Sequence, residues 1–189
     1  TSSSTLASPG TYPYDLTSGI YFQPVPFDFD NDQQTDIFVT VDYGANLMLK
    51  NVDNWHFENA TVDAGFNYFG NGMGVDVSDF NNDGYLDLVI TNTLEDYIFK
   101  NNGDGTFKNM TVHTDFARMG LGWGVSFLDY NLDGYSDIFI ANGDAQRIKD
   151  SPQGALSRPL FRSDNLYENN HSGGFTSKTG LDICPTGES

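Results

Sequence analysis

Three segments of the chain repeat one aspartate-rich pattern, and they begin at Asp28, Asp79 and Asp129, so the pattern returns after 51 and then 50 residues. Each segment leads directly into a short run of β-branched and aromatic residues, which is typical of a buried strand. A fixed period of this length indicates a repeat protein, in which each repeat is one small unit that buries its apolar side against its neighbours. The period therefore restricts the fold to a repeat architecture.

The similarity between the repeats extends to both sides of these loops. Upstream, residues 72–75 (GMGV) match residues 122–125 (GWGV), whereas the first repeat has GIYF at 19–22. Downstream, a strand-like run and a tight turn lead to an aromatic residue in every repeat, and the turn NGDG at 102–105 is a strong hairpin signal. The three aromatic residues are Phe57, Phe107 and Phe175. Helical periodicity is absent, so the sequence predicts an all-β fold of about three four-stranded units.

The repeats divide the chain into segments at about 19–69, 70–119 and 120–182, within a repeat domain that runs from 19 to 189. Residues 1–18 are rich in Ser and Thr, and we expect this segment to act as a linker or to dock on a neighbouring molecule. An insertion at 142–164 interrupts the third repeat. It contains four of the nine Lys and Arg residues: Arg147, Lys149, Arg158 and Arg162. This insertion is either a solvated surface loop or a patch that contacts an acidic surface, such as another copy of the chain.

The charge of the chain is strongly unbalanced, because 26 acidic residues face only 9 Lys and Arg, which gives a net charge of −17. Such a surface repels the phosphates of nucleic acids and anionic membranes, so we expect neither as a partner. No run approaches the roughly 18 apolar residues of a membrane-spanning helix, so we expect no membrane insertion. The same charge attracts cations, and the acids gather in the three repeated loops.

Calcium takes six to eight oxygen ligands, which proteins supply as carboxylates, backbone carbonyls and water. A loop of nine residues supplies them when the side chains at positions 1, 3 and 5 converge, position 7 gives its carbonyl, and an acid at position 9 closes the shell. In the first loop these positions are Asp28, Asp30, Asp32, Gln34 and Asp36. In the second they are Asp79, Asn81, Asp83, Tyr85 and Asp87, and in the third they are Asp129, Asn131, Asp133, Tyr135 and Asp137. We expect about three Ca²⁺ sites.

Position 6 of each loop lies where the chain turns sharply, which Gly84 and Gly134 allow without strain. Gln33 stands there in the first loop, and a non-glycine residue with positive φ costs about 1–2 kcal/mol. The first loop has four carboxylates where the others have three. A helical EF-hand is excluded, because apolar residues stand at position 12, where an EF-hand has a bidentate Glu. Without a cation the carboxylates repel one another, so we expect empty loops to be disordered or partly protonated.

These loops, the G-x-G-V lead-in and the NGDGTF turn at 102–107 resemble FG-GAP/VCBS repeats, of the kind found in cartilage acidic protein and related secreted bacterial proteins. The resemblance covers about residues 19–182 and is weaker in the first repeat, where Pro24 and Pro26 replace the usual lead-in. It implies a β-propeller of the integrin α-chain kind, with four-stranded blades and calcium in the loop between the first two strands of each blade.

Three blades are too few for a closed propeller, which has roughly four to eight. The sequence therefore predicts a partial or open propeller, whose two end blades leave apolar surface uncovered. Either the chain is a fragment of a larger secreted propeller protein, or other copies supply the missing neighbours. A head-to-tail contact that does not close on itself produces a filament. We take self-assembly into filaments as the hypothesis.

Three N-x-S/T sequons make Asn59, Asn109 and Asn170 candidates for glycosylation in a secreted protein. The Thr residues of the first two sequons have an alternative explanation in strand pairing. His56, His113 and His171 are expected at the surface, and no Ser or Cys motif offers a nucleophile. The lone Cys184 has no partner for an internal disulfide. We therefore expect no enzymatic activity.

The sequence favours an extracellular calcium-binding protein with a structural or adhesive role, whose partners are other copies of itself or other extracellular proteins. A glycan-binding module is the alternative, because propellers of related sequence bind sugars between blades. Trp55 and Trp123 are candidates for stacking on a sugar, although we expect Trp123 to pack inside a strand of the third repeat. A non-catalytic propeller attached to an enzyme is a third possibility. Longer sequence would decide that third case.

Overall fold

The structure is a computed structural model, which describes residues 19–66, 69–93, 95–111, 122–142 and 164–178. The N-terminal segment 1–18, most of the insertion at 142–164, His113 and Cys184 lie outside the described residues. The expectations for docking of the N-terminal segment and for the cationic patch of the insertion therefore stay predictions.

The described chain forms three four-stranded antiparallel sheets, each made from one sequence repeat, which we call blades 1, 2 and 3. Blade 1 contains β1 (Ile20–Phe27), β2 (Asp36–Asp42), β4 (Leu47–Asp53) and β5 (His56–Asn59). Blade 2 contains β7 (Val75–Ser78), β8 (Asp87–Ile90), β9 (Tyr97–Asn101) and β10 (Phe107–Asn109). Blade 3 contains β11 (Gly122–Leu128), β12 (Asp137–Asn142), β13 (Asn165–Asn169) and β14 (Phe175–Lys178). A short pair, β3 (Gly44–Ala45) and β6 (Phe69–Gly70), joins blades 1 and 2.

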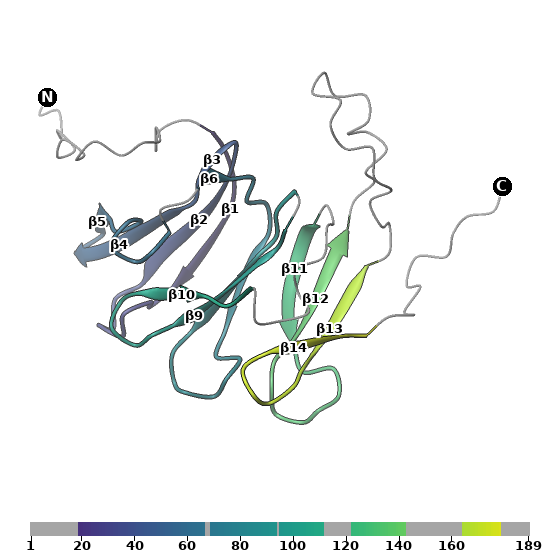
Figure 1. The fold of residues 1–189 in the computed structure, drawn as a ribbon. Coiled ribbons are helices and arrows are strands. Elements are labelled where there is room, and N and C mark those ends of the chain that lie inside the picture. The colour runs from purple at the N-terminus through teal and green to yellow at the C-terminus, as the bar shows by residue number, and fades with distance from the viewer. Residues whose placement is uncertain (1–18, 67–68, 94, 112–121, 143–163, 179–189) are drawn as a thin grey trace, which may run out of the picture.

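The strands of every blade lie in sequence order across the sheet, as in a meander. The blades stand side by side (Figure 1). β7 contacts both β1 and β11, so the first strands of the three blades are neighbours. The sheets do not close into a ring, and the described residues contain no α-helix. The predicted all-β fold of three propeller-type blades is confirmed. Within the described ranges, no helix is long and apolar enough to cross a membrane.

Two apolar cores lie between the blades, one on each side of blade 2. The core between blades 1 and 2 contains Phe38, Met48 and Phe66 from the first repeat, packed against Leu88 and Phe99. The core between blades 2 and 3 is built in the same way, from Phe80, Val89, Ile98, Ile138, Ile140, Tyr167 and Phe175. Each blade depends on its neighbours for burial of its apolar side chains, as expected for a repeat protein.

The asparagine that ends the third strand of a blade bonds to the preceding blade. The side-chain amide of Asn101 donates to the Phe29 carbonyl at 2.8 Å, and that of Asn169 donates to the Phe80 carbonyl at 2.7 Å. Each amide also donates to the carbonyl at position 8 of its own loop, Leu86 or Ser136. In blade 1, the side-chain amide of Asn51 donates, among the described residues, only to the Thr35 carbonyl of its own loop, at 3.3 Å. These amides therefore fix the distance between blades at the level of the aspartate loops.

The lead-in glycines are explained by the close approach of the preceding blade. A Cβ atom on Gly72 would lie 2.3 Å from Oδ1 of Asn46, and one on Gly122 would lie 2.7 Å from Oδ1 of Asp96. Asn46 and Asp96 occupy equivalent places, because each Oδ1 accepts a backbone N–H from the end of the strand before it, of Val41 or Asn92. Burial raises the pKa of the Asp96 carboxyl to about 7, and the nearby Glu95 adds to the effect.

Replacement of the inter-blade amide tests the contact between blades. We expect Asn101→Ala to lower the free energy of unfolding by about 1–2 kcal/mol more than Asn51→Ala, because it removes two bonds without a counterpart at Asn51: the one donated to the Phe29 carbonyl and the one accepted from the Gly103 N–H. Urea denaturation of both variants measures the difference. Equal losses in the two variants would show that neither additional bond contributes to stability.

The buried carboxyl of Asp96 predicts a pH dependence. Its pKa is raised in the folded state, so the folded state binds this proton more tightly, and stability is lost as pH rises from about 4 to about 7. Asn46 shows that an amide fits the equivalent place. We expect Asp96→Asn to raise the melting temperature above that of the unmodified protein at pH 8, with a gain that disappears near pH 4. A gain that is the same at both values of pH would contradict the assignment.

Candidate metal centres

Each aspartate loop joins the first two strands of its blade and is held by its own side chains. In the second loop, the Asp79 carboxylate accepts the backbone N–H groups of Asp83 at 2.9 Å and Gly84 at 2.7 Å. Asn81 also accepts the Asp83 N–H at 3.0 Å, and Asp83 accepts the N–H of Tyr85 at 3.1 Å. The predicted ligand residues are therefore brought together by local bonds within the loop.

The other two loops repeat this arrangement. In the third loop, Asp129 accepts the N–H groups of Asp133 and Gly134 at 3.0 and 2.9 Å. In the first loop, Asp28 accepts the N–H groups of Asp32 and Gln33 at 3.1 and 2.8 Å. The aspartate at position 1 therefore closes the same turn in all three loops.

Positive φ occurs at two places in every loop, not only at position 6. Gln33 has φ of 68°, as predicted for its place in the turn. Position 4 was not predicted, and it holds Asn31 (59°), Asn82 (58°) and Leu132 (61°). Asparagine tolerates this conformation, whereas leucine is strained in it. Leu132 is also 87% exposed, so the third loop holds a strained apolar residue at its tip.

The aspartate at position 9 is buried in all three loops, and Asp36, Asp87 and Asp137 are each 0% exposed. In blade 2, one oxygen of Asp87 accepts the Phe80 N–H at 3.2 Å and the other accepts the Asn101 N–H at 2.8 Å. Asp36 and Asp137 make the equivalent pairs of bonds in their own blades. This carboxylate therefore joins the loop to the third strand of the blade as well as facing the other acids.

Burial raises the pKa of all three position-9 carboxyls above the usual aspartate range, and that of Asp87 reaches about 7. In each case the other loop carboxylates add to the effect, such as Asp83 and Asp79 beside Asp87. A bound cation would oppose both causes.

In the first loop, one carboxylate oxygen from each of Asp28, Asp30 and Asp36 lies within 4.8 Å of the others. Oδ1 of Asp30 is buried and has no hydrogen-bond partner among the described residues. An unpartnered buried carboxylate oxygen beside two further carboxylates fits a hard cation, because burial without a partner costs free energy that a metal–oxygen bond would offset. The residues of this loop therefore fit a calcium ion.

A lysine ammonium lies against two of the loops, which the sequence analysis did not predict. Lys50 forms an ion pair with Asp30 and lies 3.3 Å from Asp32, and Lys100 lies 3.0 Å from Asp83. The hydrogen bond from Lys50 to Asp30 raises the pKa of Lys50. These lysines directly precede Asn51 and Asn101, and that shared place in the third strand was the available signal in the sequence.

Blade 3 has Glu168 at the place of these lysines. Glu168 accepts a hydrogen bond from the Tyr130 hydroxyl at 2.6 Å and pairs with Lys178. His171, predicted only as a surface residue, lies 2.8 Å from Asp133 and stacks on Tyr135 with ring centroids 4.2 Å apart. The third loop therefore has a histidine as its neighbour, where the first two have a lysine.

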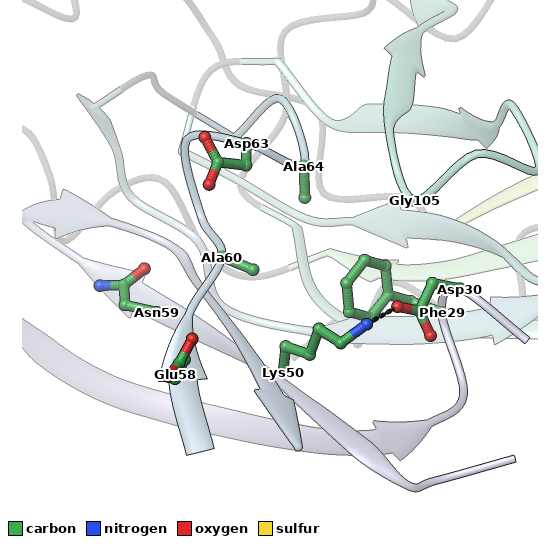
Figure 2. Close-up of a pocket in the computed structure, with 9 residues that line it drawn as sticks. All are labelled: Phe29, Asp30, Lys50, Glu58, Asn59, Ala60, Asp63, Ala64 and Gly105. Carbon is green, nitrogen blue, oxygen red and sulfur yellow. Dashed lines mark hydrogen bonds and ion pairs between the residues drawn. The ribbon is translucent and has the colours of Figure 1, made fainter. Parts of the chain in front are cut away.

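A pocket of about 260 Å³ lies beside the first loop. Phe29, Asp30 and Lys50 form one side of it, and Gly105 of blade 2 contributes to the rim. Its other lining residues are Glu58, Asn59, Ala60, Asp63 and Ala64. Figure 2 shows Lys50 reaching across toward Asp30 and the Phe29 ring. The pocket therefore combines three acidic side chains and one amine with an aromatic face.

The three sequon asparagines, Asn59, Asn109 and Asn170, are exposed. The hydroxyls of Thr61 and Thr111 accept the backbone N–H groups of Met48 and Ile98, at 3.0 and 3.1 Å. These threonines have a role in strand pairing, so their presence does not by itself indicate glycosylation.

The two tryptophans lie at different parts of the surface. Trp55, in the turn between β4 and β5, is 76% exposed. Trp123 was expected to be packed in the interior of the third repeat. It lies in β11, but its side chain is 47% exposed, so that expectation is wrong. It lies at a bulge in β11, where the side-chain alternation is interrupted, and its ring is 6.5 Å from that of Phe22.

Comparison with known families identifies an FG-GAP-like repeat at residues 28–90 and again at 79–140. The chain belongs to the FG-GAP-like repeat family. Both matches run from an aspartate loop of one blade to the second strand of the next, so they contain all three loops. No curated protein matches the sequence.

One solved structure similar to this FG-GAP-like chain is a lectin from Agrocybe aegerita that recognises non-reducing terminal N-acetylglucosamine. The TM-score is 0.45 and the sequence identity is 19%. The similarity covers 82% of this chain and 37% of the lectin chain, so this chain spans well under half of the lectin.

The two kinds of aspartate in a loop can be separated by mutation. In the presence of a chelator, we expect Asp87→Asn to lower the free energy of unfolding by about 2–4 kcal/mol, because an amide cannot accept both backbone N–H groups. Asp83→Asn is the matched control and should cost less than about 1 kcal/mol, since it is partly exposed and its amide oxygen can keep the bond to Tyr85. Chemical denaturation measures both. Equal losses would contradict the structural role of Asp87.

Proposed function

We propose that this FG-GAP-like protein is an extracellular calcium-binding module with a structural or adhesive role. The observation that supports the proposal is the cluster of three carboxylates in the first loop, with a buried carboxylate oxygen that has no hydrogen-bond partner among the described residues, together with the same hydrogen-bonded turn in all three loops. A single active site would not be repeated in every blade. Oxygen-only ligands suit hard cations such as calcium.

The residues that would hold the ion are the side chains at positions 1, 3, 5 and 9 and the carbonyl at position 7. They are Asp28, Asp30, Asp32, Asp36 and Gln34 in the first loop, and their equivalents in the other two. Calcium would supply positive charge that offsets the repulsion between the carboxylates. The ion would join the carboxylates of the loop to one another and so stiffen the corner between two strands.

The lysines predict that the three sites differ. In the first two loops the ion competes with Lys50 or Lys100, whereas the third loop has Glu168 at that place. An ammonium beside a carboxylate must move or lose its ion pair when calcium binds, and this lowers the affinity. Extracellular modules bind calcium at about 10⁻⁴–10⁻³ M, which suits weakened sites of this kind.

Calcium binding is tested by thermal unfolding and isothermal titration calorimetry. At a calcium concentration about tenfold above the dissociation constant, each filled site should stabilise the fold by about 1.4 kcal/mol, and excess chelator should abolish the gain. A variant with Asp79→Asn and Asp129→Asn should lose most of the gain, and Lys108→Ala on the exposed strand β10 is the control. An unmodified protein that melts at the same temperature with calcium and with chelator would contradict the proposal.

The structural role includes association with other copies of the chain, because blades 1 and 3 each have a face that no described blade covers. Filaments that disperse on chelation, seen by electron microscopy, would support this role together with the calcium sites. Dispersed particles under both conditions would direct attention to the second candidate.

A glycan-binding module is the second candidate. It is favoured by the exposed ring of Trp55 and by the polar pocket between blades 1 and 2, which has one aromatic wall and several hydrogen-bonding groups. Binding on a glycan array that a Trp55→Ala or Glu58→Gln variant loses would favour this candidate over a purely structural role.

A further inference from the structure

Within the chain, the contact between neighbouring blades occurs twice and uses the same register positions each time. The face that blade 2 turns toward blade 1 includes Leu88, Ile90, Phe99 and Phe107. The face that blade 3 turns toward blade 2 includes the equivalent residues Ile138, Ile140, Tyr167 and Phe175. All eight side chains are at most 7% exposed. The preceding blade is therefore what buries these positions.

Blade 1 has apolar residues at the same positions, although no described blade precedes it. They are Ile37, Val39, Leu49 and Phe57, and the pairing of Ile37 with Leu49 matches that of Leu88 with Phe99. Each of them is only half-buried. We call these four residues the leading face. It has the composition of an inter-blade core without the blade that would cover it.

Blade 3 has the opposite half of such a contact, which we call the trailing face, formed by Leu128, Tyr130, Leu132 and Phe139. Leu128, Tyr130 and Leu132 are 38%, 42% and 87% exposed, and Phe139 is half-buried. Phe139 stands where Phe38 and Val89 stand in the two cores, and both of those are 0% exposed. The trailing face is therefore also apolar and uncovered.

The two faces match residue by residue. Position 2 of the loop contacts the next blade in both existing interfaces, since the rings of Phe29 and Phe107 are 6.3 Å apart and those of Phe80 and Phe175 are 5.4 Å apart. Tyr130 is position 2 in the third loop, and Phe57 is the equivalent of Phe107 and Phe175 on the leading face. A third contact of the same kind would place Tyr130 on Phe57.

The hydrogen bonds between neighbouring blades also have a counterpart on the two faces. Asn101 and Asn169 donate to the position-2 carbonyls of the preceding blade, Phe29 and Phe80. Asn51 has no preceding blade among the described residues, and its side-chain Nδ2 donates there only to the Thr35 carbonyl of its own loop, at 3.3 Å. The carbonyl of Tyr130 is the equivalent acceptor on the trailing face.

We propose that the leading face of one copy docks on the trailing face of a second copy, head to tail. This inference rests on the structural role proposed above and names the surfaces that carry it. The first strands fit as well. Across the first interface within the chain, the Val75 N–H donates to the side chain of Gln23. In the contact between copies, Pro24 stands at the place of Val75 and has no N–H to donate. Gly124 stands there at the place of Gln23 and has no side chain to accept one. Neither partner therefore leaves a donor unpaired at this point.

One residue makes the contact between copies differ from the contact between blades. Tyr21 stands where Gly72 and Gly122 allow the preceding blade to approach closely. The tyrosine side chain holds the first strands of the two copies further apart than a glycine would. The rotation that relates one copy to the next therefore differs from the rotation that relates one blade to the next. A head-to-tail contact whose rotation does not close extends into a filament.

The experiment measures mass by light scattering after gel filtration, for the full chain in calcium, over a range of concentrations. The variants are Phe57→Arg on the leading face and Phe139→Arg on the trailing face, with His56→Arg as the control on the same strand as Phe57 but on its opposite side. We expect the unmodified protein and His56→Arg to form assemblies that grow with concentration, and Phe57→Arg and Phe139→Arg each to remain a monomer. An equal mixture of Phe57→Arg and Phe139→Arg retains one intact pair of faces and should form a one-to-one complex.

A monomeric unmodified protein at every concentration would overturn the proposal, and so would Phe57→Arg and Phe139→Arg variants that assemble as the unmodified protein does. A mixture that stays monomeric would overturn the head-to-tail arrangement. Calcium-dependent melting of each variant shows whether it folds, and it keeps the two proposals separate: a protein that binds calcium but never associates retains the calcium sites and loses this inference.

Discussion

A buried carboxylate at the ninth position of each loop connects the parts of every blade. Asp36, Asp87 and Asp137 each accept one N–H from the second position of the loop and one from the end of the third strand. The loop, the second strand and the third strand therefore meet at one side chain. The asparagine whose N–H is accepted there sends its own side chain to the preceding blade in two of the three cases. The position of the loop and the spacing of the blades are thus set at the same place.

In this arrangement a carboxyl group is buried in each loop, and burial disfavours its charged form. Burial raises the pKa of these carboxyls, and the remaining acids of the loop add to the rise. Two loops place a lysine ammonium against the outer carboxylates, and the third has a histidine instead. Either a protein cation or a metal ion can offset the repulsion among the carboxylates of a loop. The proposed calcium sites would exchange one for the other, which gives the blades a reason to differ in affinity although their loops have nearly the same sequence.

The uncovered faces follow from the number of blades. Each blade buries one face on the blade before it and the other on the blade after it, and blade 2 is the one described blade with neighbours on both sides. Blades 1 and 3 have apolar residues at the positions that would meet a further blade, and Asn51 has the amide that would bond to it. Tyr21 and Pro24 replace the residues that the internal contacts use. A second copy of the same chain, docked at a slightly different rotation, fits both the positions that match the contacts between blades and the positions that differ from them.

The sequence by itself determined the repeat, the strand order within each blade, the place of the loops and the strain at Gln33, because these depend on residues close together in the chain. The convergence of the acidic side chains within a loop was predictable for the same reason, since a loop of nine residues closes through hydrogen bonds between its own residues. Only the tertiary structure decided that Lys50, Lys100 and His171 lie against the loops, that Trp123 is exposed, and that Asn101 and Asn169 bond to the preceding blade. These contacts join residues of neighbouring strands or blades, and their partners are set by sheet register and by the packing of one blade on the next, which local sequence patterns do not encode.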